Sequence, residues 1–306
     1  MSTIEVEELR VTYTPRGAPA VEAVRGVSFT VAEGEVFGLL GPNGAGKTSA
    51  LEVCEGFRPP TAGRVRVLGL TPSDRGTAAT LRRDVGVVLQ DIAVEPFLTV
   101  REAVTRNAGY YARPRPVDDV LERVGLVEKA DARVKTLSGG QQRRLDLALG
   151  IIGRPTLLFL DEPTTGFDPS ARRGAWEVVR GLRDEGTTIV LTTHYLEEAE
   201  ALADRVCVIS AGLVVAEGAP RDIAGRGQAP VRVRFSVAAG TGEVPVAAGD
   251  VKTVEGGDVL VTTNDPTRTL HTVTSWALDH GVTLDGLVVE RATLEDVYLE
   301  LTKSAS

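Results

Sequence analysis

Eight consecutive residues near the start of the chain have the types needed to hold a phosphate group. In order they are Gly41, Pro42, Asn43, Gly44, Ala45, Gly46, Lys47 and Thr48. They fit the pattern G-x-x-x-x-G-K-[ST], in which glycines let the backbone wrap round an anion and point successive N–H groups at it. Lys47 is expected to reach the β- and γ-phosphates, Thr48 to ligate Mg²⁺, and Ser49 to add a further nucleotide contact. The sequence therefore predicts a site for a nucleoside triphosphate.

The segments on either side place this phosphate loop between a strand and a helix. Residues 35–40 form a short apolar run of strand type, and residues 49–54 continue as the first turns of a helix. The motif needs that context, and the helix N-terminus adds the positive end of its dipole. A glycine-rich turn beside a surface lysine is the alternative, and the flanking elements disfavour it.

A pair of acids follows a second apolar run. Residues 156–160 read as a buried parallel strand, and Asp161 and Glu162 come directly after it. Ligands in α/β proteins bind at such strand ends, so Asp161 is expected to hold Mg²⁺ through water. Glu162 is expected to polarise a water for in-line attack on the γ-phosphate. The alternative is a solvated turn with no role in chemistry.

The segment 137–141 is a second candidate phosphate contact. Ser138 precedes Gly139, Gly140 and Gln141 at the predicted start of a helix. A serine hydroxyl, two bare backbone N–H groups and a helix dipole make a good donor set for a γ-phosphate. Ser138 could also be an ordinary helix N-cap, with the two glycines forming a turn.

Together these motifs resemble those of the ATP-binding-cassette (ABC) ATPases, in which LSGGQ is the signature sequence. The resemblance covers residues of about 4–220 and implies roles for four further residues. Gln90 matches the glutamine that contacts Mg²⁺ or the attacking water, and His194 matches the switch histidine that contacts the γ-phosphate. Asp168 matches the aspartate at the dimer seam, although Gly166-Phe167 precedes it where leucine is common. Tyr13 matches the aromatic residue that stacks on adenine, or else it is a core aromatic.

The resemblance also implies an assembly. One chain has a single phosphate loop and a single signature, so each site requires two chains arranged head to tail. The phosphate loop of one chain then faces Ser138–Gln141 and Asp168 of the other, and a homodimer is expected. ATP and Mg²⁺ are the implied cofactors, and hydrolysis is expected to drive a separate membrane permease. That permease is expected to dock near residues 97–102 of a helical subdomain at about 90–136.

Strands alternate with helices, which indicates an α/β fold, and residues 206–216 are expected to form a hairpin. The expected architecture is a P-loop NTPase of the ABC type with an antiparallel β subdomain and a helical subdomain. We expect the ATPase domain to span 1–223, a linker 224–230, and an accessory α+β domain 231–306. In the accessory domain we expect strands at 231–237, 258–263 and 284–289 and a helix at 267–279. Apolar residues spaced i, i+3, i+4, i+7 from Leu294 to Leu301 predict a final helix.

The last part of the chain indicates which subfamily of the ABC ATPases it resembles. Residues 229–306 resemble the C-terminal extension of bacterial ABC-2-type exporter ATPases, many of which belong to drug- or antibiotic-resistance systems. The expected function is therefore ATP hydrolysis that powers small-molecule export. An importer subunit is one alternative. Another is a switch acting on a protein or nucleic acid, but the chain has neither a second cassette nor a coiled-coil insertion. An ordinary packing module is the alternative for the extension itself.

Composition agrees with a globular protein. The 306 residues are 42% hydrophobic and 25% charged, and the net charge of −8 disfavours a nucleic-acid partner. No signal peptide and no apolar run of ~18 residues is apparent, so we expect a cytoplasmic protein held at the inner face of the membrane by its permease. Cys54 and Cys207 lie in apolar stretches and are expected to be buried thiols. His271 and His280 are expected to be structural.

Overall fold

The computed structural model describes residues 2–14, 17, 19–88, 94–223, 230–238, 241, 243–247, 250–255 and 257–290. Its contacts divide the chain into two compact units, with the division between Pro220 and Arg221. The predicted linker 224–230, apart from Pro230, and the predicted final helix lie outside the described residues. Among the helices that are described, none combines the length and the apolar character needed to cross a membrane.

The first unit is built on a six-stranded sheet of order β5-β6-β7-β3-β8-β9. All neighbours in this sheet are parallel except β8 and β9, which form the predicted hairpin. The strands are β3 (Val36–Leu40), β5 (Val85–Val88), β6 (Leu157–Asp161), β7 (Thr188–Thr193), β8 (Arg205–Ser210) and β9 (Leu213–Gly218).

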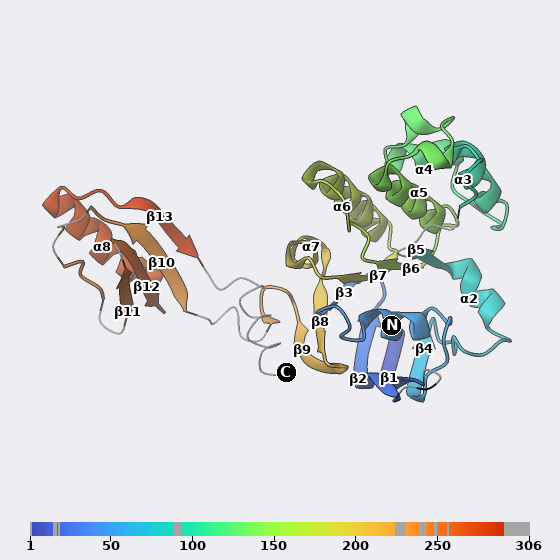
Figure 1. Cartoon of the computed structure of the whole chain (residues 1–306), viewed down its shortest axis with the longest axis horizontal. Helices are drawn as coiled ribbons and strands as arrows, with labels where there is room; N and C mark the ends of the chain where they lie inside the picture. The colour runs from blue at the N-terminus through green and yellow to red at the C-terminus, as the bar shows by residue number, and fades with distance from the viewer. Residues whose placement is uncertain are drawn as a thin grey trace. The chain divides into compact units, whose positions relative to one another are not determined.

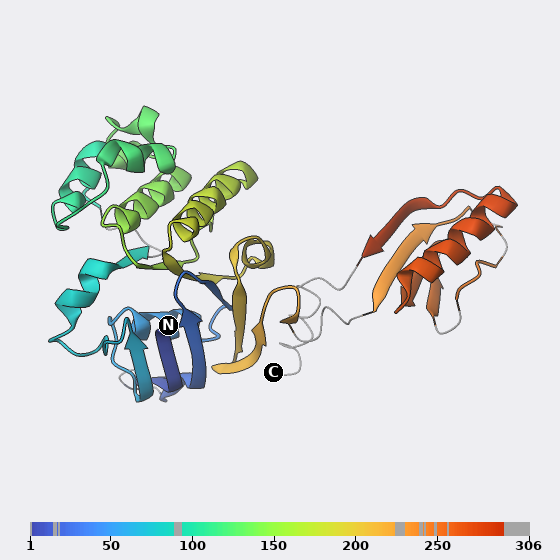
Figure 2. The ribbon, with the colours of Figure 1, turned by 180° about the vertical axis from the view of Figure 1, so that it is seen from behind.

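The central strands are apolar throughout because both faces of the sheet are covered. In β6, Leu158 and Leu160 enter one hydrophobic core with the helices of the unit, whereas Leu157 and Phe159 enter a second core on the opposite face. Alternate side chains of a strand point to opposite faces, so a continuous apolar run is required where both faces are buried. Figures 1 and 2 show the helices α5 and α6 on one side of this sheet.

The second core is closed by a three-stranded antiparallel sheet of order β2-β1-β4. Its strands are β1 (Ser2–Tyr13), β2 (Val21–Ala32) and β4 (Ala62–Val67). In β2, Val27, Phe29 and Val31 are buried and the residues between them are exposed, which is the pattern of a sheet covered on one face. This sheet is the predicted antiparallel β subdomain.

The helices of the first unit begin with α1, which continues directly from the phosphate loop. The helices are α1 (Lys47–Cys54), α2 (Ala78–Asp84), α3 (Val100–Ala108), α4 (Val117–Arg123), α5 (Gly139–Ile151), α6 (Pro169–Asp184) and α7 (Leu196–Leu202), with 3₁₀ turns η1 (Val127–Lys129) and η2 (Val134–Thr136). Helices α3, α4 and α5 pack together around one core, and α3 and α4 lie within the predicted helical subdomain. Helix α2 was not predicted, because only Leu81 of its seven residues is buried.

The second unit is a four-stranded antiparallel sheet with one helix. The sheet has the order β11-β12-β10-β13, and α8 packs against β10. The elements are β10 (Val231–Ser236), β11 (Val251–Glu255), β12 (Asp258–Thr263), α8 (Pro266–His280) and β13 (Asp285–Glu290). The sequence predicted an α+β unit but missed β11, an edge strand whose side chains are mostly exposed and so carry no buried alternation.

Helix α5 packs directly against β5 at two glycines that face each other. A Cβ on Gly86 of β5 would stand 2.3 Å from the carbonyl oxygen of Gly150 in α5. A Cβ on Gly150 would stand 2.6 Å from a methyl carbon of Val88. Neither backbone can accept a larger residue without moving α5 away from β5.

We therefore expect Gly86→Ala to lower the free energy of unfolding by roughly 1–3 kcal/mol, as overpacking does in a tight core. The measurement is equilibrium urea unfolding followed by circular dichroism. Gly181→Ala is the matched control, since Gly181 lies in α6 with open space around its Cβ position. That control should be neutral or stabilising by ~0.5–1 kcal/mol. A Gly86→Ala protein as stable as wild type would contradict the proposed contact.

Candidate functional site

The phosphate loop is shaped by close backbone approaches at two glycines. A Cβ on Gly41 would lie 2.2 Å from the carbonyl oxygen of Ile209 in β8, and one on Gly46 would lie 2.2 Å from that of Ala23 in β2. Gly46 also has φ 105°, which disfavours any other residue, and it caps the N-terminus of α1 through its backbone alone. The loop is therefore fixed between β8 and β2.

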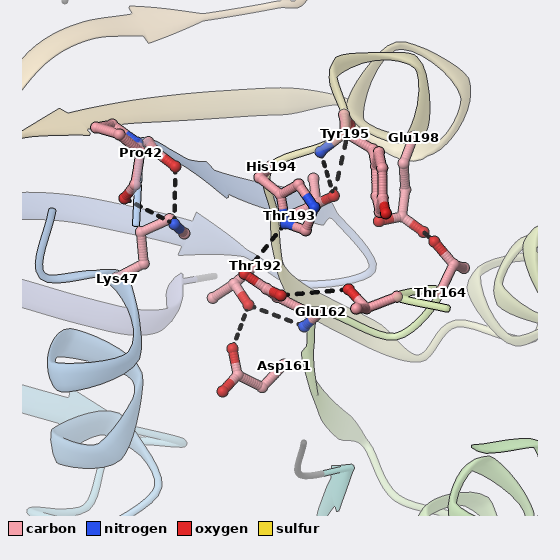
Figure 3. Close-up of polar contacts among 12 residues, drawn as sticks. Pro42, Lys47, Asp161, Glu162, Thr164, Thr192, Thr193, His194, Tyr195 and Glu198 are labelled. Carbon is pink, nitrogen blue, oxygen red and sulfur yellow. Dashed lines mark hydrogen bonds and ion pairs between the residues drawn. The ribbon is translucent and has the colours of Figure 1, made fainter. Parts of the chain in front are cut away.

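Lys47 reaches back across this loop. Its side chain is 5% exposed, and its Nζ donates hydrogen bonds to the carbonyl oxygens of Gly41 at 2.7 Å and Pro42 at 3.1 Å (Figure 3). Burial lowers the pKa of Lys47, while the charges of Glu162 and Asp161 raise it. The ammonium group is thus held between the loop and the acid pair.

A hollow of about 540 Å³ opens over the loop. Its lining consists of the residues Tyr13, Val21, Ala23, Asn43, Gly44, Ala45, Gly46, Lys47, Thr48, Ser49 and Glu162. Nearly all of the predicted nucleotide contacts therefore share one cavity, and Thr48 is exposed within it. The volume is in the range of small-molecule sites in proteins.

The acid pair lies at the carboxyl end of β6, beside β7. Asp161 is 5% exposed and accepts a short hydrogen bond from the hydroxyl of Thr192. Burial raises the pKa of Asp161, and the Thr192 hydrogen bond and the charges of Lys47 and Arg143 offset part of that rise. The Glu162 N–H donates to the Thr192 carbonyl oxygen at 3.1 Å and hydroxyl at 3.0 Å.

Glu162 has a backbone conformation that is rare for its residue type. Its φ is +48°, in the left-handed region that costs a non-glycine residue on the order of 1 kcal/mol or more. The conformation turns its side chain toward His194, whose Nδ1 lies 3.3 Å from Glu162 Oε1. The Thr165 hydroxyl donates to the other carboxylate oxygen at 3.2 Å.

His194 follows β7 and is held by its neighbours in the chain. The Tyr195 N–H donates to the Thr193 hydroxyl at 2.9 Å, and the His194 and Tyr195 rings lie 4.1 Å apart. The guanidinium of Arg172 in α6 lies 4.4 Å above the Tyr195 ring. The structure therefore brings Lys47, Asp161, Glu162 and His194 to one edge of the sheet.

Two buried charged residues near the acid pair were not predicted as functional. Arg143 of α5 donates through Nη2 to the carbonyl oxygens of Asp161 at 3.2 Å and Glu162 at 3.0 Å. Glu198 of α7 is fully buried and accepts from the Thr164 hydroxyl at 2.8 Å and Trp176 Nε1 at 3.1 Å. Charged residues among apolar ones in α5 and α7 were the only signal in the sequence, and alone they do not indicate contact with the acid pair.

The signature segment lies apart from the hollow. Ser138 is the N-cap of α5 and forms a capping box with Gln141, in which Gln141 N–H donates to Ser138 Oγ at 3.3 Å and Ser138 N–H donates to Gln141 Oε1 at 3.0 Å. Ser138 and Gly139 are nevertheless exposed, and the lining of the hollow includes no residue of 138–141. Asp168 caps α6 by accepting from the N–H groups of Ser170 and Ala171.

Tyr13 lines the hollow and also packs, half-buried, against the second core. Its hydroxyl is 2.9 Å from Ser49 Oγ and donates to Glu52 at 3.3 Å, while the Arg58 guanidinium lies 4.2 Å above its ring. Gln90, the remaining predicted site residue, lies outside the described residues.

Behind the phosphate loop, Glu55 follows the last turn of α1, and its buried Oε1 has no hydrogen-bond partner among the described residues. Burial, together with the charges of Asp161 and Glu52, raises the pKa of Glu55 to about 8. The acids around the site therefore repel one another, and the site gains from any added positive charge.

The chain is similar to two known protein families and to named proteins. A family model described as ABC transporter matches residues 24–165, and a model for the C-terminal domain of ABC transporter domain-containing proteins matches 231–293. A Nod factor export ATP-binding protein I of Rhizobium etli is 45% identical over 228 residues, which cover 73% of this chain and 70% of that protein. The protein of the same name from Burkholderia thailandensis is 49% identical over 205 residues, 65% and 67% of the two chains.

Solved structures give the same result for the fold. A dimeric ATP-binding cassette in a post-hydrolysis state, bound to ADP and phosphate, is 26% identical and superposes with a TM-score of 0.65 over 71% of this chain and 98% of that one. A component of an ABC transporter complex from Clostridium perfringens is 29% identical, with a TM-score of 0.63 over 72% and 90%.

The raised pKa of Glu55 makes stability depend on pH. Between its ordinary pKa of 4.5 and about 8, the folded protein keeps a proton that the unfolded chain has lost, so the contribution of Glu55 to stability falls as pH rises through that window. Glu55→Gln removes this loss. We expect the variant's unfolding free energy, taken relative to wild type, to be higher at pH 8 than at pH 5 by at least ~1.4 kcal/mol, the equivalent of one pKa unit.

Urea unfolding of both proteins at the two pH values measures this difference. The control is Glu128→Gln in η1, where the side chain is exposed, and its difference from wild type should not change with pH. A Glu55→Gln gain that is equal at pH 5 and pH 8 would show that Glu55 titrates normally.

Proposed function

This chain belongs to the family of ABC transporter ATP-binding proteins, which bind and hydrolyse ATP, and we propose that its hydrolysis powers a separate membrane permease that exports a small molecule. The proposal assigns the hollow over the phosphate loop to ATP and the acid pair at its edge to Mg²⁺ and the attacking water. Bound ATP and Mg²⁺ supply the phosphoanhydride bond and the charge neutralisation on which the chemistry depends.

The residues of the hollow fit a nucleotide. Backbone N–H groups of the loop and the N-terminus of α1 bind the phosphates, and Lys47 exchanges its two carbonyl partners for phosphate oxygens. Thr48 and Asp161, together with Gln90, are the proposed ligands of Mg²⁺. Ser49 and Tyr13 line the side of the hollow where the adenine and ribose would lie, and the hydrogen bond between them fixes the Tyr13 ring.

Glu162 is the proposed general base. Its carboxylate lines the hollow and lies beside His194, so it can accept a proton from a water placed next to the terminal phosphate. His194 donates a hydrogen bond to the same phosphate and orients the Glu162 carboxylate. Lys47 stabilises the negative charge that develops in the transition state.

In the proposed dimer, the signature segment of one chain completes the nucleotide site of the other chain. Ser138 and Gly139 are exposed at the N-terminus of α5 and take no part in the lining of their own hollow, which supports a contribution to a partner's site. We propose a homodimer in which Ser138, Gly139, Gly140, Gln141 and Asp168 of one chain face the nucleotide of the other. The dimeric cassette with ADP and phosphate bound supports this arrangement by analogy.

The direction of transport is proposed from the relatives. Proteins named Nod factor export ATP-binding protein I are 45–49% identical to this chain. We propose export of a drug, antibiotic or other small molecule by an ABC-2-type permease, with this chain held at the inner face of the membrane by that permease. No nucleic-acid partner is proposed. Phe97 supports the docking surface, because this residue is 68% exposed just before α3.

The observation that carries the ATPase assignment is the shared hollow of phosphate loop and Glu162. We expect Glu162→Gln to bind ATP with wild-type affinity and to lose more than about 100-fold in kcat, because the amide cannot accept a proton. Phosphate release and binding of a fluorescent ATP analogue measure the two effects. Analytical ultracentrifugation with ATP should show the variant trapped as a dimer.

Two variants make this test specific. Glu177→Gln, an exposed glutamate of α6, should keep wild-type turnover, whereas Lys47→Ala should lose nucleotide binding itself. Turnover at the wild-type rate in Glu162→Gln would remove Glu162 from the mechanism. Tight ATP binding by Lys47→Ala would remove the proposed phosphate contact.

Coupling to the permease is testable at Phe97. When it is co-expressed with an ABC-2-type permease that it serves, the chain should sediment with membranes, and Phe97→Ala should reduce that fraction several-fold by removing an exposed apolar contact. Tyr110→Ala is the control, since Tyr110 is 76% exposed but lies beyond the far end of α3. Equal membrane fractions for both variants would place the docking surface elsewhere.

A further inference from the structure

Arg143 joins the helix that carries the signature to the turn that carries the acid pair. Its side chain is 9% exposed, and its Nη2 donates to the carbonyl oxygens of Asp161 at 3.2 Å and Glu162 at 3.0 Å. We propose that Arg143 is a positioning residue for Glu162, which fixes the direction of the Glu162 carboxylate and ties it to the start of α5. This inference rests on the proposed function, in which Glu162 is the general base.

The backbone of Glu162 needs such a partner. With φ +48°, its conformation is unfavourable for a residue with a Cβ and persists only where the surroundings hold it. Thr192 accepts from the Glu162 N–H, and Arg143 donates to the Glu162 carbonyl oxygen. One residue thus has both of its backbone polar groups fixed. Strand β7 fixes the N–H, and α5 fixes the carbonyl oxygen, which also accepts from the Thr165 N–H of its own turn at 3.2 Å.

The guanidinium is suited to this contact. Successive carbonyl groups point to the same side in a helical-type turn but to opposite sides in an extended strand, so one nitrogen can bind both oxygens only while Glu162 keeps its turn. The carboxylate of Asp146, one helical turn further along α5, lies 3.8 Å from Arg143 Nη1 and helps to orient the fork. Lysine has a single flexible ammonium and does not reproduce this planar geometry.

In the proposed dimer, the contact of Arg143 with the acid pair links one catalytic site to the other. Ser138 caps α5 and Arg143 lies in the second turn of the same helix, so the two move together. In the proposed head-to-tail arrangement, Ser138 contacts the partner's nucleotide while Arg143 contacts the chain's own Glu162. Arg143 therefore makes the geometry of one catalytic site sensitive to the nucleotide in the other.

A double-mutant cycle tests the positioning role in the full-length chain. The proteins are wild type, Arg143→Lys, Glu162→Gln and the double variant, with single-turnover hydrolysis of radiolabelled ATP as the readout for the slow ones. We expect Arg143→Lys to lower kcat by about 10- to 100-fold while KM changes less than about twofold, because Glu162 is misaimed and the phosphate loop is untouched. In the Glu162→Gln background the same substitution should have no further effect.

The control is Arg144→Lys, which makes the same change one residue along α5 and should leave kcat at the wild-type value. Should Arg143→Lys fail to fold, Arg143→Gln keeps an amide donor and takes its place in the cycle. An Arg143→Lys enzyme as fast as wild type, or an equal fold-loss in both backgrounds, would overturn the positioning role. If Glu162→Gln itself turns over like wild type, the base assignment of the proposed function fails, and that result is distinct from a fast Arg143→Lys beside a slow Glu162→Gln.

Discussion

The parallel pairing of β7 with both β3 and β6 is the constraint that aligns every part of the site. In this register Thr193 is opposite Leu40, the last residue before the phosphate loop, and Thr192 is opposite Asp161. Three strands therefore end together at one edge of the sheet, and each delivers a different chemical group there: the lysine-bearing loop, the acid pair and His194. Parallel strands present their carboxyl ends on the same side, which is why ligands of α/β proteins gather at that edge.

The hydrogen bonds of Thr192 fix how Asp161 and Glu162 lie at this edge of the sheet. One threonine accepts from the N–H of Glu162 through its hydroxyl and its carbonyl oxygen, and donates to the Asp161 carboxylate. The acids are held close together although burial and mutual repulsion raise the pKa of Asp161. Burial and the repulsion between the carboxylates make this arrangement electrostatically costly, Lys47 offsets part of that cost, and a bound divalent cation would offset more.

The site also depends on how α5 packs against the sheet. The glycines at 86 and 150 let this helix approach β5 closely, and Arg143 then reaches the carbonyl oxygens of the acid pair. Helix α7 makes a similar connection through Glu198 to Thr164. The turn that follows β6 is thus contacted by β7, α5 and α7, so a shift of the helical subdomain has a direct mechanical route to Glu162. The family relationship supplies the reason that such a route matters, since ABC cassettes couple hydrolysis to movement of another protein.

The fold class and the family could be assigned before any coordinates, because the phosphate loop, the signature and the apolar strands depend on local residue types at fixed spacing. The same local signals did not reveal β11 or α2, whose side chains are mostly exposed and carry little periodic pattern. Which residues meet depends on contacts between distant segments. Tyr13 lines the hollow and also packs against the second core, and the signature lies outside the hollow of its own chain. The role of Arg143 could not be read from the sequence, because its partners are backbone carbonyl oxygens some twenty residues away, and only strand register and helix packing bring them within reach.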